Sequence, residues 1–241
     1  MIVAFDIETA ATWNEGDDSL DPKKGLGITC IGYASPSDGE GPPRTWAFHS
    51  AIDIGEKRMN RSRAWGTLES LIAMQMAGAT IVTWNGLFDW HVLGVEAGDL
   101  ETAARGCLNH VDLMLAFHAV QGYPLGLKAA AAAVGSHKGT DDVGSGAMAP
   151  DLWAVGEYEK VLEYVKQDAV ATLDVALHLA ELGRFTWQTR RGGYRRFILP
   201  RNVDGLKDMQ VKDVCQWPEP DQSWQSTPLR RKDMIAWMDM G

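Results

Sequence analysis

Apolar residues recur along the chain with two spacings, one typical of strands and one typical of helices. Short apolar or alternating runs predict strands at 1–8, 28–34, 45–49 and 79–84. Residues 61–77 carry apolar side chains at helical spacing and end before Gly78. Strands that come first and then alternate with helices predict an α/β fold built on a mixed sheet.

The second half of the chain has longer periodic segments. Helices are predicted from residue 86, at 127–135 and, as a long amphipathic helix, at 157–182. The glycine-rich and serine-rich stretch 135–150 predicts a loop. Residues 185–200 contain two strand-like runs around Arg-Arg-Gly-Gly, which predicts a β-hairpin.

Composition narrows the class of protein. The 241 residues are 45% hydrophobic and 23% charged, which argues against disorder, collagen or a disulfide scaffold. Three widely spaced cysteines (Cys30, Cys107 and Cys215) with no CxxC pair indicate reduced thiols and no cysteine zinc site. Without a signal-like N-terminus or an apolar run near the roughly 18 residues of a membrane span, we expect a soluble, cytoplasmic protein.

Charge divides the chain into two parts. The formal net charge is −9, which results from −13 over residues 1–183 and +4 over residues 184–241. We expect an acidic domain at 1–183 and a basic, tryptophan-containing appendage at 184–241. Solvation of the surface would explain the asymmetry, and so would an acidic cleft for cations beside a basic arm for a polyanion.

Two acids are placed in a hydrophobic strand near the N-terminus. Asp6 and Glu8 are two residues apart, so both side chains leave the same face of the sheet. Like charges among residues that favour burial are costly unless a cation neutralises them. The pair predicts a cation site, or else a strand end that emerges into solvent.

Two further pairs are spaced four residues apart on predicted helices. Asn85 and Asp89 follow a strand and share one helix face, and Tyr164 and Asp168 do so on the long helix. Each pair alone is equally consistent with an ordinary helix acid or a surface pair.

The three motifs together resemble the DEDD superfamily of 3′–5′ exonucleases, which includes RNase D and polymerase proofreading domains. FDIET matches the first motif, NGLFD the second and YVKQD the third, in that order, within residues 1–183. The resemblance is to the tyrosine (DEDDy) variant. The histidine variant needs a histidine five residues before Asp168, where this chain has Glu163.

The resemblance implies an RNase H-like fold, a mixed sheet flanked by helices with the acids at its C-terminal edge. It also implies two divalent cations: Asp6 would bridge them, Glu8 and Asp168 would complete the first site, and Asp89 would support the second. Mg²⁺ or Mn²⁺ fits ligands that are all oxygen.

The resemblance gives the remaining motif residues a role in substrate handling. Tyr164 would orient the attacking water, and Thr9, Asn85 and Phe88 would contact the terminal nucleotides. The expected activity is hydrolysis at single-stranded 3′ ends with release of nucleoside 5′-monophosphates. DNA is favoured over RNA only slightly, because these motifs do not recognise the sugar.

Three alternatives stay open. The same site would serve an exoribonuclease that trims RNA. An endonuclease on the same fold is a second alternative, and a non-catalytic nucleic-acid-binding module that uses the appendage is the third. The intact set of acids argues against the binding module, since a binder has no need of four mutually repelling carboxylates.

Outside the motifs, the predicted hairpin carries an arginine cluster. These side chains could contact substrate phosphates while Tyr194 or Trp187 stacks on a base, or they could form a solvated turn. The cluster consists of Arg190, Arg191, Arg195 and Arg196.

Four other residues are expected to be structural. Asp112, an acid among apolar neighbours, matches an acidic position of the family, yet a capping or buried paired acid is the favoured interpretation. Trp217, Trp224 and Trp237 are expected in the core of the appendage.

Overall fold

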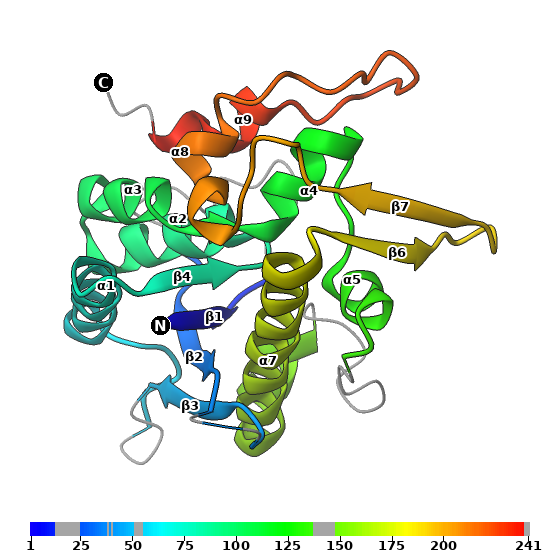
Figure 1. Ribbon diagram of the computed structural model, residues 1–241. Coiled ribbons are helices and arrows are strands. Elements are labelled where there is room, and N and C mark those ends of the chain that lie inside the picture. The colour runs from blue at the N-terminus through cyan, green and yellow to red at the C-terminus, as the bar shows by residue number, and fades with distance from the viewer. Residues whose placement is uncertain (13–24, 38, 40, 51–54, 137–147, 239–241) are drawn as a thin grey trace.

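The computed structural model describes residues 1–12, 25–37, 39, 41–50, 55–136 and 148–238. A five-stranded mixed sheet in the order β3-β2-β1-β4-β5 forms its centre (Figure 1). The strands are β1 (Ile2–Thr9), β2 (Ile28–Ser35), β3 (Arg44–His49), β4 (Thr80–Thr83) and β5 (Val111–Asp112). β1 pairs antiparallel with β2 and parallel with β4, which makes it the middle strand.

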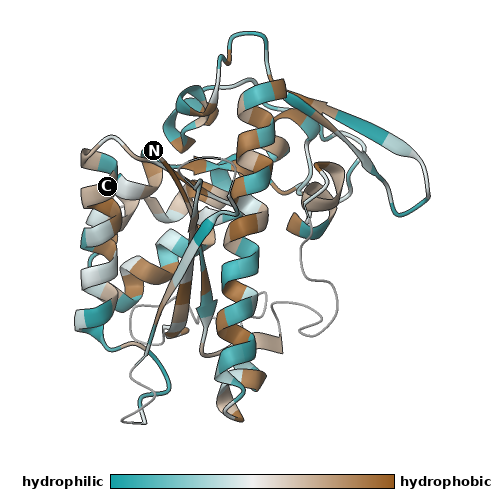
Figure 2. Ribbon diagram, turned by 60° about the horizontal axis from the view of Figure 1, so that its bottom comes forward, coloured by the Kyte–Doolittle hydropathy of each residue, from teal (hydrophilic) through white to brown (hydrophobic). Residues whose placement is uncertain are grey.

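Helices cover both faces of this sheet. The helices described up to residue 182 are α1 (Arg61–Met76), α2 (Gly86–Ala97), α3 (Leu100–Leu108), α4 (Leu113–Gln121), α5 (Leu127–Ala133), α6 (Ala149–Ala154) and α7 (Tyr158–Leu182). α7 lies along one face, and α1 and α2 lie on the other (Figures 1 and 2). All eight residues of β2 are buried, as expected for a strand covered on both sides. The predicted α/β fold is confirmed.

A glycine sets the distance between α7 and the sheet. Gly32 of β2 is the cross-strand partner of Asp6. A Cβ atom at Gly32 would lie 2.5 Å from the carbonyl oxygen of Val165 in α7, closer than real Cβ atoms approach other atoms. The missing side chain therefore lets the backbone of α7 approach the strand beside Asp6.

The predicted strands and the long helix agree with the structure to within a few residues. The hydrophobic pattern predicts no element between residues 99 and 126, where α3, β5 and α4 lie. Of the predicted loop 135–150, residues 137–147 lie outside the described residues. Its last two residues, Ala149 and Pro150, are buried and begin α6.

The predicted hairpin is confirmed as β6 (Arg184–Gln188) and β7 (Tyr194–Ile198). Phe185, Trp187 and Phe197 of the hairpin pack around Phe117 of α4, with ring centroids 5.1–6.1 Å apart. Trp187 is only 4% exposed. The suggestion that Trp187 stacks on a base is wrong, because the alternation of the strand points its ring into the core.

The chain after the hairpin consists of short elements, η4 (Leu206–Met209), α8 (Val211–Val214), α9 (Arg231–Ile235) and η5 (Ala236–Met238). Trp217 is buried, and Trp237 is partly buried with its ring stacked on His91. Trp224 is 62% exposed, so its expected place in the core is wrong. Its ring packs edge to face with Tyr123, and its Nε1 donates a hydrogen bond to the Asp221 carbonyl at 3.1 Å.

Apolar side chains from this last part of the chain join the same hydrophobic cluster as the helices and strands around the sheet. The division at residues 183 and 184 stays a prediction. None of the helices in the described part of the chain is long and apolar enough to cross a membrane.

Candidate active site

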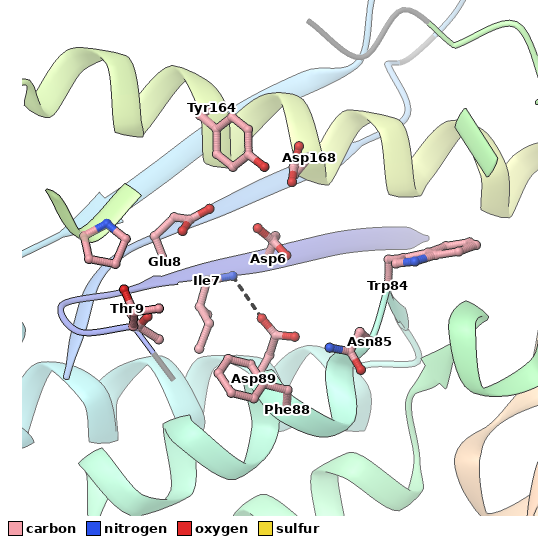
Figure 3. A pocket seen from close by; sticks show the side chains of 12 residues that line it. Asp6, Ile7, Glu8, Thr9, Trp84, Asn85, Phe88, Asp89, Tyr164 and Asp168 are labelled. Carbon is pink, nitrogen blue, oxygen red and sulfur yellow. Dashed lines mark hydrogen bonds between the residues drawn. The ribbon is translucent and has the colours of Figure 1, made fainter. Parts of the chain in front are cut away.

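The central strand brings two acids to one side of the sheet. Asp6 and Glu8 both point from β1 toward α7, while Ile7 between them points to the other side (Figure 3). Glu8 is buried and Asp6 is half-buried. The side chains alternate as the spacing of the motif predicts.

The second motif begins at a strained turn. Asn85 precedes α2 with φ 68° and ψ 32°, and it is the one non-glycine residue with positive φ in the described ranges. Such a left-handed conformation costs energy and needs support from its surroundings. One turn later, the buried Asp89 accepts a hydrogen bond at its Oδ1 from the Ile7 backbone N–H, at 3.1 Å (Figure 3).

Asp112 supplies the support for that turn. Its Oδ1 accepts hydrogen bonds from the backbone N–H groups of Asn85 (3.1 Å) and Leu115 (3.0 Å), and its Oδ2 accepts one from Leu87 (3.1 Å). Asp112 is fully buried and caps α4. Asp112 is therefore a capping acid, as expected. It also fixes the start of α2 through these hydrogen bonds, although it does not line the cavity itself.

The third motif faces the first across the site. Tyr164 and Asp168 lie one turn apart on α7, and both side chains point toward β1 (Figure 3). Asp168 is buried and Tyr164 is half-buried. The close contact at Gly32 lies between these two residues along the helix and positions them.

The three motifs surround one cavity of about 330 Å³. It is lined by Asp6, Ile7, Glu8, Thr9, Thr12, Trp84, Asn85, Phe88, Asp89, Pro150, Tyr164 and Asp168. All eight candidate residues of the motif regions are among them. The candidate arginines Arg190, Arg191, Arg195 and Arg196 are exposed on the hairpin and do not line this cavity.

Four lining residues were not predicted from the sequence as site residues: Ile7, Thr12, Trp84 and Pro150. Trp84 directly precedes Asn85, so the sequence alone could have predicted that it lies next to the second motif. The Trp84 Nε1 donates a hydrogen bond of 3.0 Å to the Leu125 carbonyl oxygen, and this bond holds the indole in place. Pro150 comes from α6, for which no pattern signal exists.

Negative charge is concentrated in this cavity. Burial raises the pKa of Asp89 to about 8, and the charges of Asp112 and Asp168 act in the same direction. Burial, followed by the charge of Asp168, raises the pKa of the Tyr164 phenol well above its ordinary value. The phenol therefore stays neutral at physiological pH and can donate a hydrogen bond.

The donor set fits hard divalent cations. In the ranges that the structure describes, no three acidic, histidine or cysteine side chains are arranged as a ready-made metal site. Mg²⁺ commonly keeps several waters and takes only one or two carboxylates together with substrate phosphates. A cavity with four carboxyl groups, of which Asp89 retains its proton, suits such a cation, because the cation would replace that proton and relieve the repulsion.

Comparison with known proteins identifies the family. A family model described as RNase_H superfamily matches residues 3–180, which contain α2 and nearly all of β1 and α7. Among curated proteins, none matches the chain. The match covers well over half of the sequence and agrees with the mixed sheet and its flanking helices. The chain belongs to the RNase H superfamily.

Proposed function

We propose that the protein is a divalent-metal-dependent 3′–5′ exonuclease that acts on single-stranded nucleic-acid ends, with DNA slightly favoured. The observation that carries the proposal is the shared cavity, because β1, α2 and α7 bring four carboxylates and a tyrosine into its lining. Membership of the RNase H superfamily favours nuclease chemistry. The tyrosine on α7 supports the DEDDy type.

The reaction joins a water oxygen to the terminal phosphorus and breaks the bond to the 3′ oxygen of the preceding nucleotide. A nucleoside 5′-monophosphate leaves, and the 3′ oxygen of the shortened strand takes up a proton to become a 3′-hydroxyl. When bound, two Mg²⁺ or Mn²⁺ ions would stabilise the charge that develops on the attacking and leaving oxygens. The residues that would hold them are Asp6, Glu8, Asp89 and Asp168.

The other lining residues would orient the reactants. Tyr164 has a neutral phenol that can hydrogen-bond the attacking water and fix its direction. A cavity of about 330 Å³ has the size of a small-molecule site and suits one terminal nucleotide rather than a duplex. Thr9, Asn85 and Phe88 line the cavity and would contact that nucleotide.

The test is digestion of 5′-labelled single-stranded DNA and RNA oligonucleotides with Mg²⁺, with Mn²⁺ and with a chelator. A ladder that shortens from the 3′ end, needs metal and disappears in Asp168→Ala supports the proposal. Glu159→Ala is the matched control, because Glu159 is an exposed acid on the same helix. It should leave the ladder unchanged.

The other outcomes distinguish the alternatives. Faster RNA digestion favours an exoribonuclease that trims RNA, and internal cuts indicate an endonuclease. Binding without cleavage of either substrate indicates a non-catalytic binding module. The cytoplasmic location also stays a proposal, supported by three free cysteines.

A further inference from the structure

The two faces of the β6–β7 hairpin have different surroundings. Directly paired residues share a face, so the pairs Phe185–Phe197 and Trp187–Arg195 form one side, whose aromatic rings pack on α4. The opposite side carries the other cross-strand pairs. These are Arg184–Ile198, Thr186–Arg196 and Gln188–Tyr194.

This second face borders a cavity of about 350 Å³ next to α5 and the end of α7. The lining includes Arg184, Thr186 and Arg196 of the hairpin and His178 of α7. The ring Nε2 of His178 lies 3.1 Å from the carbonyl oxygen of Arg184 and ties the start of β6 to α7. Farther along the same face, Tyr194 is 73% exposed.

The described residues that line this cavity include two arginines and no acid. Residues 182–203 contain six arginines and no acid. Within the part of the chain that the structure describes, none of these arginines forms an ion pair with a carboxylate. Much of the hairpin is hydrophilic in Figure 2, and it projects from the body beside α5 in Figure 1.

A purely structural explanation accounts for part of this arrangement. Arg184 follows the C-terminus of α7, where a cation is favourable because of the helix dipole. That explanation does not extend to Arg196 on the neighbouring strand or to the exposed ring of Tyr194.

We propose that this face and its cavity bind the backbone of a single-stranded nucleic acid, with phosphates at Arg184 and Arg196 and a base stacked on Tyr194. Unpaired guanidinium groups match phosphates, and an exposed aromatic ring suits any base. The register divides the candidate arginines: Arg196 belongs to the site, whereas Arg195 shares the opposite face with Trp187.

As part of the proposed exonuclease, this site would hold the strand upstream of the cleaved end, and that role rests on the proposed function. Asp168 and His178 are ten residues apart on α7, roughly 15 Å along the axis at 1.5 Å per residue. At about 3.4 Å per stacked nucleotide, this corresponds to roughly four to five nucleotides. A dinucleotide in the catalytic cavity would not reach the arginines.

The test measures binding of a fluorescent twelve-nucleotide oligothymidylate by anisotropy in the presence of a chelator, where no hydrolysis occurs. Arg184→Gln combined with Arg196→Gln should weaken binding about tenfold or more. It should also reduce the slope of log affinity against log salt by about 1.4, or about 0.7 for each lost phosphate contact. Tyr194→Ala should weaken binding about tenfold, and Tyr194→Phe should not.

The matched control is Arg195→Gln combined with Arg201→Gln, which removes the same charge from exposed positions outside the cavity. It should weaken binding less than about threefold. Equal losses for the two double variants would overturn the proposal in favour of diffuse attraction. Competition by polyglutamate as effective as that by unlabelled oligothymidylate would overturn it in favour of an acidic protein partner.

A second arm distinguishes this inference from the proposed function. With metal present, the Arg184→Gln, Arg196→Gln variant should raise KM for the twelve-nucleotide strand about tenfold and leave dinucleotide hydrolysis unchanged. If the wild type hydrolyses neither substrate but the anisotropy results hold, the exonuclease proposal fails and the binding site stands. Equal loss on both substrates would contradict the upstream position of the site.

Discussion

Replacing Gly32 with alanine should move α7 away from the sheet at the candidate active site without removing any of the proposed ligands. The new Cβ would lie 2.5 Å from the Val165 carbonyl oxygen and 2.9 Å from the Lys166 nitrogen. Both atoms belong to the backbone of α7 and cannot rotate away. To reach an ordinary contact of 3.4 Å, the helix has to move by roughly 0.9 Å away from the strand that pairs with Asp6.

A shift of this size has two measurable costs. Overpacking of a core typically destabilises a protein by about 1–3 kcal/mol. A displacement of about 1 Å between reacting groups can lower a rate about 100-fold. We therefore expect Gly32→Ala to remain folded in urea titrations, to lose about 100-fold in kcat on a labelled oligonucleotide, and to gain less thermal stability from Mn²⁺ than the wild type does.

The control is the same substitution at a half-buried glycine with free space around it. Gly66 lies inside α1, and a Cβ there meets no atom within 4 Å. Gly66→Ala should leave activity unchanged and stabilise the protein by up to about 1 kcal/mol. The reasoning fails if Gly32→Ala keeps its activity within about threefold and its full response to Mn²⁺.

Three further predictions concern single groups of the site. In Asp112, both carboxylate oxygens accept hydrogen bonds from backbone N–H groups, and Asp112→Asn would turn an NH₂ group toward one of these donors. The free energy of unfolding in urea should therefore fall by about 1–3 kcal/mol, and an unchanged value would contradict the capping role. In chelator, folded Asp89 keeps its proton up to about pH 8, whereas an unfolded aspartate loses it near pH 3.8. Stability should therefore fall as pH rises between these values, and Mg²⁺ should raise Tm more at about pH 8.5 than at about pH 6; a Tm that is independent of pH would refute this. Tyr164→Phe should lower kcat by about tenfold or more with unchanged Mn²⁺ binding, and full activity would exclude a role for its hydroxyl.

The sequence predicts those parts of the fold and site whose geometry is local. Asp6 and Glu8 alternate on a strand and Tyr164 and Asp168 share a helix face, so their directions follow from the repeat of each element. The resemblance to a known family then predicts that these side chains lie close together, and in the structure all four line the same cavity.

Long-range contacts explain what the sequence pattern does not predict. β5 has two residues, too few to show any alternation, and the role of Asp112 depends on a turn 27 residues earlier in the chain. The fit between Gly32 and Val165 joins positions that no local pattern relates. The burial of Trp187 follows from its packing on Phe117, which belongs to a helix that the hydrophobic pattern does not indicate.

The position of α7 also has a consequence for biosynthesis. This helix covers the face of β1 and β2 that carries Asp6 and Glu8, yet it ends at Leu182. At about 5–20 residues per second, a ribosome needs roughly 7–30 s to extend the chain from the end of β2 to the end of α7. During this interval the nascent strands lack their covering helix and the acids of the first motif lack Tyr164 and Asp168. A growing chain would therefore lack the proposed nuclease activity until most of it has been made.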